Sequence, residues 1–244
     1  MFQVVVLFIV GIVVCLFIAK AILKFIPKKF HIIISFVLYG IVILLAYKIY
    51  DGVMTPIKFN KEKVVRFTAT INNMKMIRDA QSAHRTVIGK YCAKGEDLVR
   101  FIDTAQFAVT VARNEVKIVD VGGGITNEVE YRVIDTTGYT DVRAIFVGKD
   151  YKNMMNVPGT DRQFIMTLGA IPRTNGIMAS VYEIKVTKSV VLHGMNKDLI
   201  RLEEEAYADS EIKGKNISVG SLNEVSDSGN WPPIYDQADR QKEK

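Results

Sequence analysis

Two long apolar runs occupy the first fifty residues of the chain. Residues 2–19 form an apolar run in which Gln3 is the one polar side chain, and residues 30–46 form a second that is nearly unbroken. Each is about the length that a helix needs to cross a bilayer, roughly 20 residues for a ~30 Å hydrocarbon core. Residues 24–29 between them are too few for anything but a tight turn. The pattern therefore predicts a transmembrane helical hairpin over residues 1–50.

A short polar stretch with helix-breaking residues follows the second run. Asp51-Gly52 and Thr55-Pro56 predict that the second helix ends as it leaves the membrane. Residues 51–60 are therefore expected to be a linker. Asn60 is then expected to cap a new helix, with Glu62 in its first turn where the helix dipole favours an acidic side chain.

Past this linker, apolar residues recur at spacings of three and four. This period predicts a long amphipathic helix that ends at Gly89, because glycine suits the left-handed conformation just beyond a helix. The stripe is expected to face a core rather than a cofactor. It consists of Val64, Phe67, Ile71, Met74, Ile77, Ala80, Ala83 and Val87.

Strand-like patterns dominate the rest of the chain, after a short helix predicted over residues 96–104. Two β-hairpins are predicted. The first joins residues 106–112 to 116–121 through Arg113-Asn114-Glu115, and the second contains Asn175-Gly176, a strong turn signal. The other expected elements are strands at residues 164–171 and 177–186 on either side of that turn, short apolar runs at 129–134 and 142–147, a polar helix at 196–208 and a closing strand at 217–222.

The order of these elements indicates the fold class. Helices that come first and strands that follow predict an α+β fold rather than a βαβ alternation. The expected architecture is an N-terminal two-helix transmembrane hairpin and then a long amphipathic helix packed on a mostly antiparallel sheet. The expected domains are the hairpin at residues 1–50, the linker at 51–60, a soluble α+β domain at 61–226 and a polar, disordered tail at 227–244.

Charge changes this picture mainly by orienting the hairpin. The net charge of +6 is spread along the chain, as on a solvated surface, so no nucleic-acid partner is expected. Basic residues near helix ends favour the cytoplasm. The turn carries Lys20, Lys24, Lys28 and Lys29, whereas the residues before the first run carry no basic side chain. This predicts an integral inner-membrane protein with a periplasmic domain; basic residues after the second run favour the opposite orientation, which stays open.

Four of those basic residues are predicted to contact the membrane surface. Ten linker residues span at most ~35 Å when extended, which keeps the following charges near the lipid headgroups. Each could contribute about 1 kcal/mol of attraction to an anionic leaflet. The alternative is that they are solvated positions on the outer face of the long helix. The four residues are Lys58, Lys61, Lys63 and Arg66.

No constellation of residues indicates a reaction. Neither the histidines nor the cysteines have metal-ligand spacing, and His84 has no Ser and Asp at positions that would form a triad. Gly122-Gly123-Gly124 lacks the lysine and following helix of a phosphate-binding loop. The acidic run Glu203-Glu204-Glu205 is expected to be a solvated helix face. No catalytic residue, cofactor or metal is therefore predicted.

Two stretches of the soluble part carry a resemblance to known proteins. The first, residues 57–101, contains Ile77-Arg78-Asp79-Ala80-Gln81, Gly89-Lys90-Tyr91 and Leu98-Val99-Arg100-Phe101, and the second contains Ile217-Ser218-Val219-Gly220-Ser221-Leu222 and Ser228-Gly229-Asn230-Trp231. Together they resemble a group of uncharacterised, membrane-anchored proteins of Bacteroidetes. The first stretch is also loosely similar to type IV pilins and pseudopilins, in which a membrane helix leads into an amphipathic helix, a Gly-x-Tyr turn and a small antiparallel sheet. Two predicted membrane helices and the absent prepilin leader depart from that pattern, so the resemblance implies only the fold and an exported domain.

These observations lead to an expectation about function. The chain is expected to be a membrane-anchored structural or interaction component of the bacterial cell envelope, with the soluble domain as a docking surface. Its expected partners are membrane lipids and either another protein or further copies of itself. Two alternatives stay open: an envelope-acting enzyme whose site is assembled from distant residues, and a cytoplasmic-facing membrane adaptor.

Overall fold

The computed structural model describes residues 10–11, 13–20, 28–120, 126–173, 176–206, 208 and 211–236. The chain divides into two compact units, Met1–Lys58 and Phe59–Lys244. Helix α2 (Lys28–Ile88) begins in the first unit and continues into the second. The fold is α+β, with a long apolar helix near the N-terminus followed by antiparallel sheets.

The first unit contains a candidate membrane span. Among the described helices, α2 alone is long and apolar enough to cross a membrane; its most apolar window has a mean hydropathy of 2.4, and none of that window is buried. Phe36, for example, is 73% exposed. Of the first apolar run, residues 10–11 and 13–19 are helical, and the others lie outside the described residues. One apolar helix compatible with an anchor is therefore shown, and a two-helix hairpin is not.

The predicted break at Asp51-Gly52 and Thr55-Pro56 is wrong. Helix α2 is continuous for 61 residues with Pro56 inside it, so residues 51–60 are helical and Asn60 is not a cap. Proline removes one backbone hydrogen bond, here the bond to the carbonyl group of Gly52, at a cost of about 3 kcal/mol. Because helix propagation adds a bond for each residue fixed, a helix extended on both sides tolerates that single loss.

The second unit is built around the C-terminal half of α2. The predicted apolar stripe is confirmed from Phe67 to Ala83, where every member is buried, but Val64 and Val87 at its ends are exposed. The helix ends at Ile88, and Gly89 follows with a φ of +84°. The predicted glycine stop is therefore confirmed.

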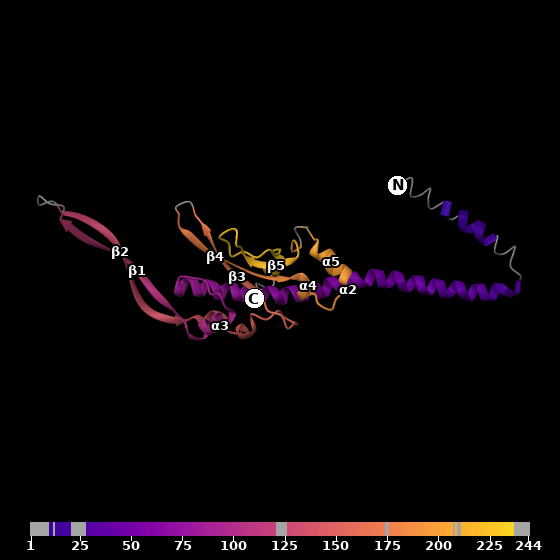
Figure 1. Ribbon diagram of the computed structural model, residues 1–244, viewed down its shortest axis with the longest axis horizontal. Coiled ribbons are helices and arrows are strands. Elements are labelled where there is room, and N and C mark those ends of the chain that lie inside the picture. Colours follow the sequence, from indigo (N-terminus) through magenta and orange to yellow (C-terminus); the bar gives the residue numbers. More distant parts are fainter. Residues whose placement is uncertain are drawn as a thin grey trace. The chain divides into compact units, whose positions relative to one another are not determined.

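A three-stranded antiparallel sheet packs in this unit (Figure 1). Its strands are β3 (Ile165–Pro172), β4 (Met178–Thr187) and β5 (Asn216–Gly220), in the order β3-β4-β5. The predicted second hairpin and closing strand are confirmed. Tyr182, Ile184 and Val186 of β4 are buried in the hydrophobic core that also contains the α2 stripe.

A separate two-stranded sheet forms a long ribbon. It pairs β1 (Gln106–Asp120) with β2 (Thr126–Asp141) in antiparallel register from Gln106↔Asp141 to Asp120↔Thr126. The predicted hairpin through residues 113–115 is wrong, because β1 continues through them. Val111, Arg113 and Glu115 keep the register of the strand and lie opposite residues 135, 133 and 131 of β2. In Figure 1 the ribbon extends away from α3 and the three-stranded sheet.

Short elements complete the second unit. Helix α3 (Gly95–Thr104) buries Leu98, Phe101 and Ile102 as predicted. The apolar run at residues 142–147 forms the 3₁₀ helix η1 (Val142–Phe146), and a second 3₁₀ turn is η2 (Tyr151–Asn153). The other two helices are α4 (Lys188–Val191) and α5 (Lys197–Glu204), the second shorter than the predicted polar helix.

The last described residues pack onto α2 instead of forming a loose tail. Trp231 and Tyr235 are both 8% exposed. The Lys75 ammonium donates a 2.8 Å hydrogen bond to the carbonyl oxygen of Tyr235 and lies 2.9 Å from the Asp236 carboxylate. Burial by itself would raise the pKa of the Asp236 carboxyl, but hydrogen bonds from Lys75 and Trp231 outweigh it and hold that pKa below its usual value. The predicted disorder is therefore wrong up to Asp236, and residues 237–244 lie outside the described residues.

Candidate functional site

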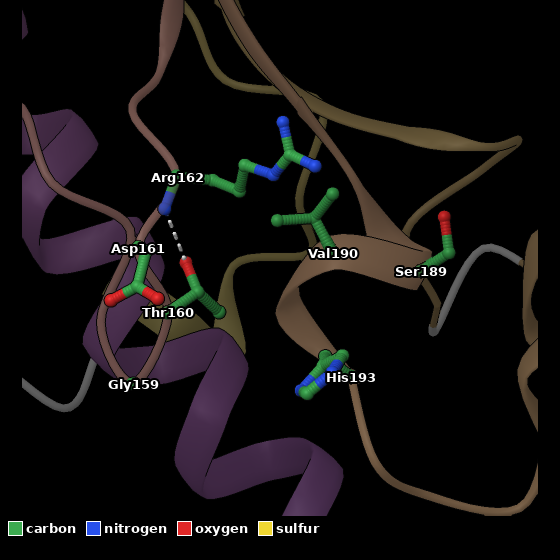
Figure 2. Close-up of a pocket in the computed structure, with 7 residues that line it drawn as sticks. All are labelled: Gly159, Thr160, Asp161, Arg162, Ser189, Val190 and His193. Atoms are coloured by element: carbon green, nitrogen blue, oxygen red, sulfur yellow. Dashed lines mark hydrogen bonds between the residues drawn. The ribbon is translucent and has the colours of Figure 1, made fainter.

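An open groove of about 670 Å³ lies in the second unit between a loop and helix α4 (Figure 2). The loop supplies residues 159–162, and the α4 side supplies Ser189, Val190 and His193. A volume of this size is within the range of small-molecule sites. The groove is therefore the first place to look for chemistry.

Local hydrogen bonds set the shape of the loop wall. The Val157 N–H donates to the carbonyl oxygen of Arg162 at 2.8 Å, and the Thr160 N–H donates to that of Val157 at 3.1 Å. The Thr160 hydroxyl oxygen accepts from the Arg162 N–H at 3.2 Å. Gly159 has a φ of +75°, a conformation that glycine adopts without a side-chain clash. The loop is thus a tight turn that leaves the Arg162 side chain exposed.

Helix α2 holds the other wall in place through Arg66. Its guanidinium donates to the carbonyl oxygens of His193 at 2.7 Å and Val191 at 3.3 Å, and it also pairs with Glu62. The Val191 carbonyl group is the last of α4 and that of His193 lies two residues beyond it, where a helix leaves its last acceptors without internal partners. Arg66 therefore caps α4 from outside and fixes the position of His193.

A buried ionic cluster anchors the start of α4. Lys188 is fully buried, and its ammonium donates to the carbonyl oxygens of Glu203 and Ile212, each at 2.5 Å. The Glu203 carboxylate lies 3.3 Å from the Lys188 nitrogen and 2.7 Å from that of Lys63. Burial lowers the pKa of Lys188, and the negative charge of Glu203 offsets part of that effect. One carboxylate thus joins α2, α4 and α5.

The polar groups of the groove do not form a catalytic arrangement. Figure 2 shows the Ser189 and His193 side chains pointing away from each other, and none of the described hydrogen bonds joins them. A nucleophile needs a base within hydrogen-bonding reach, and the base needs an orienting partner. In the described part of the chain, no group of three or more His, Cys, Asp or Glu side chains is placed to hold a metal ion. The groove offers polar contacts without an activated nucleophile.

The structure separates the four residues predicted to contact the membrane surface. Lys58 and Lys61 are exposed, and membrane contact stays a prediction for them. Lys63 is only 9% exposed and is committed to its ion pair with Glu203, which corrects the prediction for this residue. Arg66 is partly buried and donates to the carbonyl oxygen of Val191, the last residue of α4. The position of a basic residue on a helix near an apolar run does not show whether its side chain contacts lipid headgroups or a partner inside the domain.

The buried ionic cluster was not predicted from the sequence. The acidic run at residues 203–205 reads as a solvated face, but Glu203 is 6% exposed whereas Glu205 is exposed. A weak signal does exist at Lys188, which lies between the buried Ile184 and Val186 of β4 and the apolar Val190-Val191-Leu192. A charge in such a segment requires a partner if it is buried. Its partners come from residues 63 and 203, which are remote in sequence.

The largest group of exposed large apolar side chains in the described part of the second unit lies on the β1–β2 ribbon. Its large apolar side chains are 42–69% exposed along most of its length. Only the base of the ribbon meets the core, where Phe107 packs against buried residues. The exposed residues are Val109, Val111, Val116, Ile118, Val119, Val129, Tyr131, Ile134 and Tyr139.

Comparison with known proteins adds no assignment to this geometry. No protein-family model matches the chain, and no curated protein or solved structure matches it either.

Proposed function

We propose that the chain is a membrane-anchored structural or interaction component of the bacterial cell envelope, and that its soluble unit is a docking surface. The observation that carries this proposal is the β1–β2 ribbon with its nine exposed large apolar side chains. The groove supports an enzyme less well, because Ser189 and His193 point apart. The exposed ribbon is better evidence for a protein-binding surface than the groove is for an active site.

Physical chemistry favours a partner for the ribbon. A two-stranded ribbon by itself is marginally stable in water, because few of its side chains are buried. Both outer edges of this ribbon are unpaired among the described residues, and an unpaired edge is a template for another strand. Binding of a further strand would bury apolar side chains, and it would also give hydrogen-bond partners to the backbone N–H and C=O groups along one edge.

The anchor is part of the same proposal. Helix α2 supplies one apolar segment of sufficient length, and the apolar run at residues 2–19 would supply the second helix of a hairpin. The lysines between the two runs support a hairpin in the inner membrane with its turn in the cytoplasm. The soluble unit would then lie in the periplasm. Lys58 and Lys61 are exposed and would add contacts with anionic lipid headgroups. A protein held at one membrane meets its partners in two dimensions, which suits a docking role.

Site-specific photo-crosslinking in intact cells tests the docking proposal. A photoreactive phenylalanine derivative would replace Ile118 on the ribbon, which is 65% exposed, in the full-length chain. The matched control replaces Leu202 of α5, which is 59% exposed. We expect discrete adducts of higher mass from position 118 and not from position 202. If position 118 gives no discrete adduct, the ribbon is not a docking surface in the cell.

A further inference from the structure

The two edges of the β1–β2 ribbon are not equivalent. The register shifts between Val109 and Thr110, which face Gly138 and Thr136, so Thr137 is an extra residue in β2. A bulge bends the strand that contains it and disturbs pairing at that edge. Strand β1 has no extra residue and presents a regular edge from Gln106 to Asp120. The β1 edge is therefore the one better suited to accept a further strand.

We propose that two copies of the chain pair along their β1 edges, antiparallel about a two-fold axis at Asn114. The result is a four-stranded sheet in the order β2-β1-β1-β2. This proposal rests on the docking function and names its partner as a second copy of the chain. A two-fold pairing needs a self-complementary strand. If residue i of one copy faces residue j of the second copy, then residue j of the first copy also faces residue i of the second.

The charges of β1 are self-complementary in this register. With Asn114 facing Asn114 of the second copy, Arg113 faces Glu115 of that copy, and Glu115 faces its Arg113. Opposite charges directly across an antiparallel pair stabilise it, and like charges destabilise it. The two residues already lie on one face, where the Arg113 guanidinium is 3.0 Å from Glu115 and 3.1 Å from Asp135. A guanidinium has five N–H donors, so it can bond a further carboxylate.

Three of the five exposed large apolar side chains of β1 meet apolar residues in the same register, whereas Val111 faces Lys117 and Ile118 faces Thr110. Val109 then faces Val119 of the second copy, and Ala112 faces its Val116. Both valines of the first pair are more than 40% exposed in the single chain, as is Val116. Cross-strand apolar pairs contribute to sheet stability in the same way as charge pairs. The dimer would therefore cover part of the exposed apolar surface that defines the ribbon.

Other two-fold registers are poorer. Pairing centred on Arg113, Glu115 or Lys117 places each of those residues opposite its own copy, so like charges meet. Pairing centred on Val116 places Glu115 opposite Lys117 but uses only residues 112–120. The register centred on Asn114 uses residues 108–120 of the same strand. It combines opposite charges with the longer run of backbone pairing.

Disulfide trapping tests the register in the full-length chain in its native membranes. The native cysteines are first replaced, as Cys15→Ser and Cys92→Ser. Asn114→Cys should then form a disulfide-linked dimer on mild oxidation, because directly opposed residues have Cα atoms about 4.5–5.5 Å apart, within the range of a disulfide. Val116→Cys is the matched control and should form at least about fivefold less dimer, since it would face Ala112. A dimer from Val116→Cys and not from Asn114→Cys overturns the register.

A charge swap tests the complementarity directly in the Asn114→Cys background. Arg113→Glu should lower dimer formation about fivefold, because it places two carboxylates opposite each other. The double change Arg113→Glu and Glu115→Arg should restore it, since opposite charges meet again. Unchanged Trp231 fluorescence shows that each variant is folded. Failure of the double change to restore the dimer overturns the charge pairing.

The outcome at position 118 separates this inference from the docking function. An adduct of dimer mass there, together with the Asn114→Cys dimer, supports both. Adducts with a different protein, with no Asn114→Cys dimer, overturn the second copy as partner and leave the docking function standing. No adduct at position 118 and no Asn114→Cys dimer overturn both.

Discussion

Glu203 contributes to stability because a single buried carboxylate neutralises two lysines. It lies 2.7 Å from the Lys63 ammonium and 3.3 Å from that of Lys188, and it is 6% exposed. Glu203→Ala would leave the Lys63 and Lys188 ammonium groups buried without this carboxylate. Removing one partner of a buried ion pair typically costs 3–5 kcal/mol, so we expect a loss of about 3 kcal/mol of unfolding free energy.

The measurement is guanidinium unfolding of the detergent-solubilised full-length chain, followed by fluorescence. Trp231 is the one tryptophan in the sequence, and it is buried in the second unit, so its signal reports on that unit. The control is Glu205→Ala, two residues away and exposed, which should change stability by less than about 0.5 kcal/mol. Equal effects of the two substitutions would show that the cluster does not stabilise the fold.

At the residue scale, the sequence predicts apolar partners better than polar ones. The stripe from Phe67 to Ala83 follows from the helical period alone, since every member faces one side of the same helix. Lys63 shows the limit of this reasoning. The position of Lys63 on α2 does not reveal that Glu203 is its partner. The two side chains meet only in the folded domain, once α4 and α5 have packed. The groove was missed for the same reason, because its two walls come from separate segments.

At the scale of elements, Asn196 determines where α5 begins. Its side-chain oxygen accepts hydrogen bonds from the N–H groups of Asp198 at 3.0 Å and Leu199 at 3.2 Å. Asn196→Ala would leave both donors without this acceptor, and we expect it to lower the unfolding free energy by about 1 kcal/mol. Asn196→Asp keeps an acceptor and should stay close to wild type in the same fluorescence measurement. If both variants lose the same amount, the cap is not the cause.

Element types followed from the sequence more reliably than element boundaries. The Asn175-Gly176 signal correctly predicted that β3 and β4 form a hairpin, because these residue types favour a turn between two strands; Asn175 itself lies outside the described residues. Polar residues at Arg113-Asn114-Glu115 misled the prediction of β1, since a ribbon open to water on both faces tolerates charges in mid-strand. Pro56 misled the prediction of α2 because a local rule was applied to a helix extended on both sides.

For the whole molecule, the testable feature is the apolar part of α2 as an anchor. Val37 and Ile41 lie four residues apart in it and are 58% and 48% exposed. Replacing both by lysine would place two charges at the centre of the span, at a cost of about 2.5–3.5 kcal/mol each. We expect a smaller fraction of the chain to remain in membranes after alkaline extraction.

Val65→Lys is the control for this experiment. Val65 lies on the same helix in the second unit and is 65% exposed, so a lysine there should leave membrane retention unchanged. Full retention of the doubly substituted chain would mean that this part of α2 is not the anchor.

The contact between Lys75 and Asp236 has a consequence for biosynthesis. The two residues are separated by 161 positions, and the buried Trp231 and Tyr235 belong to the same late segment. A ribosome adds about 5–20 residues per second, so the partner of Lys75 is made at least about 8 s after Lys75 itself. During that interval the apolar stripe of α2 lacks part of its final cover. The apolar stripe is therefore least protected from aggregation until nearly all of residues 1–236 have been synthesised.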